Sequence, residues 1–239
     1  MVLLLLGGSK SPQKPVAAAV YRGHYEGMTA ETPNADKLNL PQAFLLLATN
    51  DKDGEPEVPQ SVLRAALAGA ILAELDLLGA IQLQGKYVRA TGAPPETDFR
   101  HQWEAIHDKS RPHSPRRWVS MLESRTELHR IYEEMAALGI VNHVGERHLG
   151  LFRTTRYPEK DHAPEGALIK RIEAALNGAP SDARTTALIG LLQAAGLLQK
   201  HFPAADPGRV RELTYGHWPS RAVVDELRMI RLAESEAAT

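Results

Sequence analysis

The sequence predicts a mainly α-helical fold in a single globular domain, with a few short β-hairpins. The chain is rich in alanine and leucine and has only 5% aromatic residues, which favours helices packed on small and branched side chains. Two segments, 61–78 and 182–198, are very apolar along much of their length, which is typical of buried helices. Gly79 and Gly139 each separate a predicted helix from a short alternating segment, a pattern that indicates a hairpin after the helix.

Length and composition limit the classes of protein that the chain can belong to. The 239 residues suffice for one large domain, and 43% hydrophobic with 24% charged residues is ordinary for a folded protein. The chain has no cysteine, so it forms no disulfide or thiolate metal site, and a reducing cytoplasmic compartment fits. Because the formal net charge is only −1, we expect no nucleic-acid binding, and binding to anions requires a local basic patch.

Residues 1–37 differ in character from residues 38–239. The first segment is rich in Gly, Pro, Ser, Lys and Ala without a sustained period, so we expect a partly disordered or loosely docked arm before a helical domain. Its apolar run, residues 2–6, is shorter than the core of a secretory signal. The longest uncharged stretch, residues 185–199, is shorter than the roughly 20 residues of a membrane span, and no transmembrane helix is expected.

In the first half of the domain we expect two helices and a hairpin. Pro41 suits the first turn of a helix that continues to residue 47. Ser61 has the side chain of an N-cap for a helix that ends near residue 78, with Gly79 as its stop. The segments 81–83 and 87–89 should then pair as a hairpin.

In the second half we expect a hairpin between helical segments. Its strands are predicted at 140–144 and 147–152, with a two-residue type II′ turn at Gly145 and Glu146. That turn would place His143 opposite His148, close enough to share a metal ion, but no third ligand accompanies them and we expect no metal site. The helices are predicted near residues 98–109, 115–138, 165–176, 182–198 with Asp182 as N-cap, and 221–234.

No sequence pattern typical of catalysis is present. The chain has no glycine-rich phosphate loop, no nucleophile elbow and no His-Glu-x-x-His motif. Paired acids such as Glu133 and Glu134 fall on the solvent side of an amphipathic helix. We therefore expect a protein that is not an enzyme and that needs no cofactor.

A basic segment with two interleaved tryptophans is the strongest local indication of binding. Guanidinium groups donate to phosphate oxygens, and indoles such as those of Trp103 and Trp118 prefer the boundary between water and lipid. One interpretation is a site for a lipid headgroup or an anionic partner, and the other is a solvated basic face. The segment and its extension into the next helix contain Arg100, Lys109, Arg111, Arg116, Arg117, Arg125 and Arg130.

The predicted hairpin at 140–153 carries large apolar side chains. Alternation would place Leu149 and Leu151 on one face and Phe152 on the other. These residues either pack on the core or lie on a projecting hairpin that mediates self-association or inserts shallowly into a bilayer.

Five segments, in order and at family-like spacing, carry a resemblance to a known family. They are Leu-Pro-Gln-Ala-Phe-Leu-Leu-Leu-Ala at 40–48, Ala-Leu-Ala-Gly-Ala-Ile-Leu-Ala-Glu-Leu at 66–75, His-Ser-Pro-Arg-Arg-Trp-Val at 113–119, Gly-Leu-Phe-Arg-Thr-Thr-Arg-Tyr-Pro-Glu at 150–159 and Arg-Thr-Thr-Ala-Leu-Ile-Gly-Leu-Leu-Gln-Ala-Ala-Gly-Leu-Leu at 184–198. Over residues 38–235 the chain resembles the Golgi phosphoprotein 3 family, including its bacterial members. The resemblance implies apolar central helices ringed by amphipathic helices, a projecting β-hairpin and no enzymatic activity. It also implies a peripheral membrane protein that binds phosphatidylinositol 4-phosphate and the tails of partner proteins.

The residues of the family's lipid pocket are only partly present. Pro59 stands where the family has a tryptophan, and Ala68 stands where it has an arginine, although Arg64 lies one turn earlier on the same face. Of two further arginines, one matches Arg125, and the other falls on Leu128 with Arg130 nearby. The resemblance thus implies an anion site at Arg64, Arg125 and Arg130.

These observations together predict a cytoplasmic, non-enzymatic protein that docks peripherally on anionic lipid membranes. The residues expected to contact headgroups are Arg64, Arg125, Arg130, Arg116 and Arg117, and the 140–153 hairpin is expected to mediate self-association or membrane contact. The alternative is an adaptor that binds protein partners and has lost lipid binding.

Overall fold

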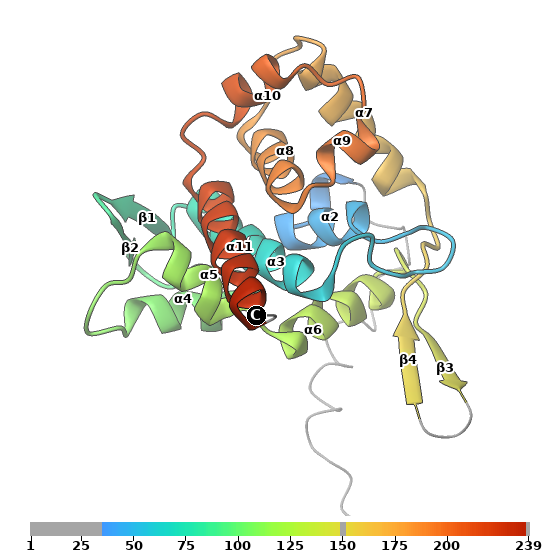
Figure 1. Ribbon diagram of the computed structural model, residues 1–239, viewed down its shortest axis with the longest axis horizontal. Coiled ribbons are helices and arrows are strands. Elements are labelled where there is room, and N and C mark those ends of the chain that lie inside the picture. The colour runs from blue at the N-terminus through green and yellow to red at the C-terminus, as the bar shows by residue number, and fades with distance from the viewer. Residues whose placement is uncertain (1–34, 149–151, 238–239) are drawn as a thin grey trace, which may run out of the picture. The chain divides into compact units, whose positions relative to one another are not determined.

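A computed structural model describes residues 35–148 and 152–237 (Figure 1). Contacts divide the chain into residues 1–31 and residues 32–239, and every described residue belongs to the second unit. The predicted arm therefore lies outside the described residues except for Ala35–Lys37, which form a short 3-10 helix with Ala35 buried. Among the described helices, none combines the length and apolar character needed to cross a bilayer.

Four helices form the centre of the fold, and two of them coincide with the apolar segments 61–78 and 182–198. They are α2 (Leu40–Leu47), α3 (Gln60–Leu77), α8 (Ala183–Ala195) and α11 (Trp218–Ala237). Helix α3 packs against α2, α5, α8 and α11, and nearly all of its residues between 63 and 75 are buried (Figure 1). The predicted class, a mainly helical domain with apolar helices at its centre, is confirmed.

Close approach between α3, α8 and α11 depends on two glycines. A Cβ atom built on Gly69 of α3 would lie 2.1 Å from Cγ2 of Val223 on α11. One built on Gly190 of α8 would lie 2.9 Å from Oγ of Ser220. Because glycine has no side chain, α11 packs directly against the backbones of α3 and α8 at these two positions.

One largely buried ion pair fastens three of these helices together. Glu74 of α3 is 5% exposed and accepts hydrogen bonds from Arg184 of α8 at 2.8 and 3.0 Å. It also accepts from the backbone N–H of Leu40, in the first turn of α2, at 2.7 Å. The carboxylate is thus surrounded by donors, which offsets the cost of burying its charge.

The predicted helix over 115–138 is wrong, because the chain forms two helices there. Helix α5 (Pro115–Leu122) ends before Glu123, and α6 (Arg125–Ala137) begins after Ser124, whose hydroxyl accepts from the N–H of Glu127. Ser124 is therefore an N-cap. The N-cap prediction at Ser61 is also wrong, since α3 begins at Gln60 and Pro59 occupies its N-cap without a side-chain hydrogen bond.

The first predicted hairpin is confirmed. Strand β1 (Ile81–Gln84) pairs antiparallel with β2 (Tyr87–Ala90), and Gly79 before it has φ of +67°. Helix α4 (Arg100–His107) follows and contacts β2.

The second hairpin exists, but its predicted register is wrong. Strand β3 (Val144–His148) pairs with β4 (Phe152–Arg156), so that His148 lies opposite Phe152 and Gly145 lies inside a strand opposite Thr155. His143 lies before β3, and its Nδ1 is 2.7 Å from Oε1 of Glu133, so the predicted pairing with His148 does not occur. Figure 1 shows the hairpin extending away from α6.

The remaining helices cover α8. They are α7 (Ala163–Leu176), α9 (Leu198–His201) and α10 (Pro207–Thr214). Asp182 caps α8 as predicted, accepting from the N–H of Thr185 at 2.7 Å, but α8 ends at Ala195 before Gly196, which has φ of +78°. Helix α10 was not predicted, although Asp206 before Pro207 has the side chain of an N-cap.

Candidate functional site

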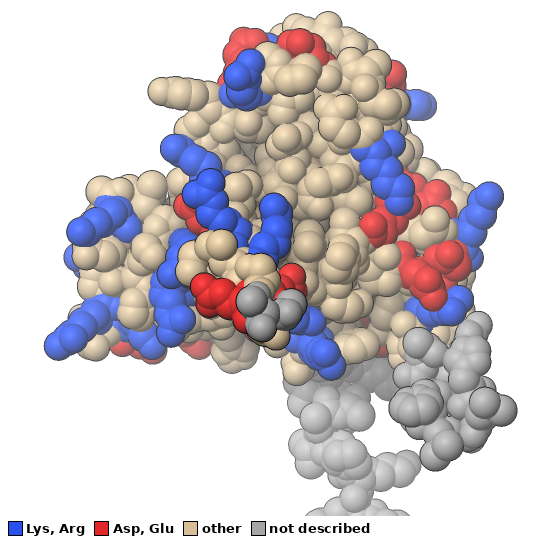
Figure 2. All heavy atoms as spheres, viewed as in Figure 1, with Lys and Arg blue, Asp and Glu red and all other residues tan. Residues whose placement is uncertain are grey.

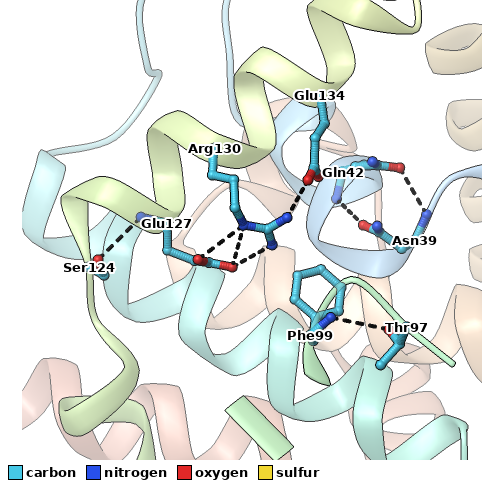
Figure 3. A network of polar contacts seen from close by, with 8 residues as sticks. All are labelled: Asn39, Gln42, Thr97, Phe99, Ser124, Glu127, Arg130 and Glu134. Atoms are coloured by element: carbon cyan, nitrogen blue, oxygen red, sulfur yellow. Dashed lines mark hydrogen bonds and ion pairs between the residues drawn. The ribbon is translucent and has the colours of Figure 1, made fainter. Parts of the chain in front are cut away.

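The guanidinium of Arg130 is held by two carboxylates of its own helix (Figure 3). Its Nε lies 3.2 Å from both carboxylate oxygens of Glu127, and its Nη1 pairs with Glu134 on the following turn. The same group lies over the ring of Phe99, 5.5 Å from its centroid. Because its donors are used within this network, Arg130 has a structural role that the predicted headgroup site did not anticipate. The sequence signal for this role was the presence of glutamates three residues before and four residues after Arg130, a spacing that brings their side chains together on a helix.

Arg64 and Arg125 lie near Glu123 rather than beside Arg130. Burial and then the carboxylate of Glu226 raise the pKa of Glu123, whereas the nearby Arg64 lowers it. Arg125 is exposed at the start of α6, two residues beyond Glu123. Arg125 and Arg130 are five positions apart on α6, which turns their side chains about 140° apart around the helix. Helix geometry therefore separates Arg130 from Arg125, and whether Arg64 and Arg125 form an anion site stays a prediction.

Arg116 and Arg117 are adjacent on α5 but have different surroundings. Arg116 donates to Oε2 of Glu226 at 2.8 Å, and this glutamate of α11 is 7% exposed. Arg117 is exposed. Arg116 thus neutralises a buried acid, and Arg117 projects its charge into solvent.

An open pocket of about 440 Å³ lies where the β1–β2 turn, the start of α5 and the start of α11 meet. Lys86, Arg116 and Arg221 bring positive charge to its wall, and Asp225 brings negative charge. The first residues of α5 also line it, and the positive end of the helix dipole adds to the potential there. The sequence did not indicate Lys86 or Arg221, because each is isolated along the chain and only the fold brings them to Arg116.

The outer face of α11 combines exposed apolar side chains with arginines. Val224, Met229 and Leu232 are 49%, 46% and 49% exposed. The exposed arginines of the same helix are Arg221, Arg228 and Arg231. Figure 2 shows Lys and Arg side chains gathered over α4, α5 and α11, with acidic side chains mainly towards the β3–β4 hairpin, α10 and the end of α11. We call the surface of α5, α11 and the β1–β2 turn the basic face.

The two tryptophans of the basic segment are part of the core, not of this surface. Trp103 is 4% exposed and donates from its indole N–H to the carbonyl of Ala80 at 2.9 Å, and Trp118 is 1% exposed. The expectation that they mark a lipid boundary is wrong, because helical spacing turns both indoles inward.

The predicted hairpin residues are mostly beyond what the structure describes. Leu149 and Leu151 lie outside the described residues, and Phe152 begins β4 with a side chain that is likewise outside the description. Val144, at the start of β3, is 37% exposed. Whether the hairpin contacts a second copy or a membrane stays a prediction.

Comparison with known proteins identifies the family. No curated protein matches this chain significantly. The family model described as Golgi phosphoprotein 3 (GPP34) matches residues 40–230, which include all four central helices up to Ile230 of α11. Because this match covers most of the chain, the protein belongs to the Golgi phosphoprotein 3 (GPP34) family.

Proposed function

We propose that the protein is a non-enzymatic, peripheral membrane protein that docks on anionic lipids through the basic face. The observation that carries this proposal is the meeting of Lys86 and Arg221 around one open pocket, beside exposed apolar side chains of α11. Cations attract lipid phosphates, and apolar side chains among them can enter the headgroup region. Family membership agrees with a binding role at membranes.

The ligand that we propose is the phosphate of a lipid headgroup, with phosphatidylinositol 4-phosphate as the first candidate because of the family. In this chain the phosphate would contact Lys86, Arg221 and the start of α5, since Arg130 is held by Glu127 and Glu134. Arg117 would contact neighbouring headgroups, and Arg64 and Arg125 would extend the positive surface around the C-terminal end of α5.

Vesicle sedimentation tests the proposal. The purified protein should bind vesicles with about 30% phosphatidylserine, or a few per cent of phosphatidylinositol 4-phosphate, and should ignore neutral phosphatidylcholine vesicles. Raising the salt concentration from about 0.05 to 0.5 M should abolish most of the binding, because exposed charges are screened. Equal sedimentation with neutral and anionic vesicles at low salt would contradict the proposal.

A second candidate is an adaptor that self-associates or binds proteins through the β3–β4 hairpin. The observation in its favour is that β3 and β4 form a two-stranded sheet, whose outer strand edges can pair with another chain. Replacing residues 145–155 by a short glycine linker should then lower the mass measured by light scattering. An unchanged mass would argue against the hairpin as a self-association element.

A further inference from the structure

Away from the basic face, four side chains that can ligate metals gather beside the base of the β3–β4 hairpin. One ligand atom from each lies within 4.8 Å of every other, and the four residues are Asp51, Glu159, His162 and Glu165. We call them the Asp51–Glu165 cluster. They come from the loop after α2, the segment after β4 and the first turn of α7, so the fold and not the sequence spacing brings them together (Figure 1).

The backbone around the cluster is fixed by hydrogen bonds. The N–H of Glu159 donates to the carbonyl of Asp51 at 3.0 Å, and Glu159 also forms a β-bridge with Val141. His162 is the N-cap residue of α7, and Glu165 follows in its first turn. The four side chains therefore extend from anchored positions, as preorganised ligands must.

Two of the three acidic side chains of the cluster are buried. The side chain of Glu159 is only 2% exposed, and its Oε1 is buried without a hydrogen-bond partner, while its Oε2 pairs with Nδ1 of His162. Glu165 is 7% exposed. Burial, and then the carboxylates of Glu159 and Asp51, raise the pKa of Glu165 to about 8. Hydrogen bonds with Asp51 and Glu159 also raise that pKa, so a proton is shared among these carboxylates, and a bound cation would take its place.

We propose that the Asp51–Glu165 cluster binds a divalent cation of the Zn²⁺ or Mn²⁺ class. Three carboxylates and one imidazole make an O₃N ligand set, and the imidazole favours these ions over Mg²⁺ and Ca²⁺. Around an ion with metal–ligand bonds of about 2.1 Å, donor atoms lie about 3 to 4 Å apart, so side-chain shifts of about 1 Å suffice to close the site. The ion would fasten the loop after α2 and the base of the hairpin to α7. This inference is independent of the lipid proposal, since no residue of the basic face takes part.

Calorimetric titration of the chelator-treated full chain tests the site. Zn²⁺ or Mn²⁺ should bind with one equivalent and a dissociation constant below about 0.1 mM, and Ca²⁺ should bind at least 10-fold more weakly. At a 100-fold excess over that constant, the thermal unfolding midpoint should rise by about 5 to 10 °C.

Two variants and one matched control locate the binding. Glu165→Gln and His162→Ala should each weaken binding at least 10-fold. The double control His101→Ala with Glu104→Gln removes another histidine–glutamate pair three residues apart, at 3.3 Å on α4, and should bind like the wild type. His162 is 71% exposed, so its replacement should leave the circular dichroism spectrum unchanged and keep the test usable if Glu165→Gln fails to fold.

Three results would overturn the inference. The first is wild-type binding weaker than about 1 mM. The second is binding that both cluster variants retain at wild-type strength, which would place the ion on other residues. The third is a preference for Ca²⁺ over Zn²⁺ and Mn²⁺, which would remove the role assigned to the imidazole of His162.

Discussion

Replacing Arg184 by methionine should destabilise the protein by about 3 kcal/mol. The variant removes two hydrogen bonds, of 2.8 and 3.0 Å, from Glu74, whose side chain is 6% exposed. Breaking a buried ion pair costs about 3 to 5 kcal/mol because it leaves an uncompensated charge. We take the low end, because the backbone N–H of Leu40 still donates to Glu74 at 2.7 Å and Arg184 is itself 37% exposed.

Unfolding in guanidinium chloride, followed by the helical signal in circular dichroism, measures this loss of unfolding free energy. For a chain of this size, about 3 kcal/mol corresponds to a drop of roughly 6 to 12 °C in the thermal midpoint. The matched experiment repeats Arg184→Met in a Glu74→Gln background, where residue 74 carries no charge and its amide oxygen can still accept from the N–H of Leu40. There the substitution should cost only about 1 kcal/mol, the value of an ordinary hydrogen bond. Equal losses in the two backgrounds, or a loss below about 0.5 kcal/mol in the first, would refute the reasoning.

Two further stability predictions concern the packing of α11 on α3 and the residue that precedes α11. Gly69→Ala should lower the free energy of unfolding by about 1 to 3 kcal/mol, because the new methyl group meets Val223, a β-branched residue with little freedom to move. Adding Val223→Ala should recover part of this loss. Strictly additive losses of the two substitutions in chemical unfolding would contradict the contact. The second prediction concerns His217, whose pKa is lowered to about 4 by burial and then by Arg221. The unfolded chain therefore binds this proton more readily than the folded chain, and the free energy of unfolding should fall as the pH drops from about 6.5 to about 4. His217→Asn should remove up to about 3 kcal/mol of that pH dependence, and parallel pH profiles of unfolding free energy for the variant and the wild type would count against it.

Helices buried on all sides were predictable from the sequence, and boundaries set by single residues were not. The uncharged middle of α3 leaves no face for water, so its burial follows from composition alone. The break between α5 and α6 depends on Ser124 and Glu127, two polar residues inside an otherwise helical pattern. The strands β3 and β4 were misplaced because Gly145 was taken as a turn residue, whereas it lies within β3 opposite Thr155 of β4.

The candidate site was predictable only where it depends on neighbours in the sequence. Arg116 and Arg117 were found because they are adjacent, but Lys86 and Arg221 reach the same pocket from a hairpin and from the last helix. Arg130 was misassigned because its charge, and not the two acids of its own helix, guided the prediction. The Asp51–Glu165 cluster was missed because a backbone hydrogen bond, and not proximity in the sequence, brings Asp51 to Glu159.

The most direct test of the central proposal is whether membrane binding depends on the basic face. The triple variant Lys86→Gln, Arg117→Gln and Arg221→Gln removes exposed cations from this face, each worth about 1 kcal/mol near an anionic membrane. Its partition onto vesicles with about 30% phosphatidylserine should be about 100-fold weaker than that of the wild type. The control Lys52→Gln, Lys170→Gln and Arg211→Gln changes the net charge equally at exposed positions elsewhere and should bind within about 3-fold of the wild type. Equal weakening in the two triple variants would contradict a docking site on the basic face.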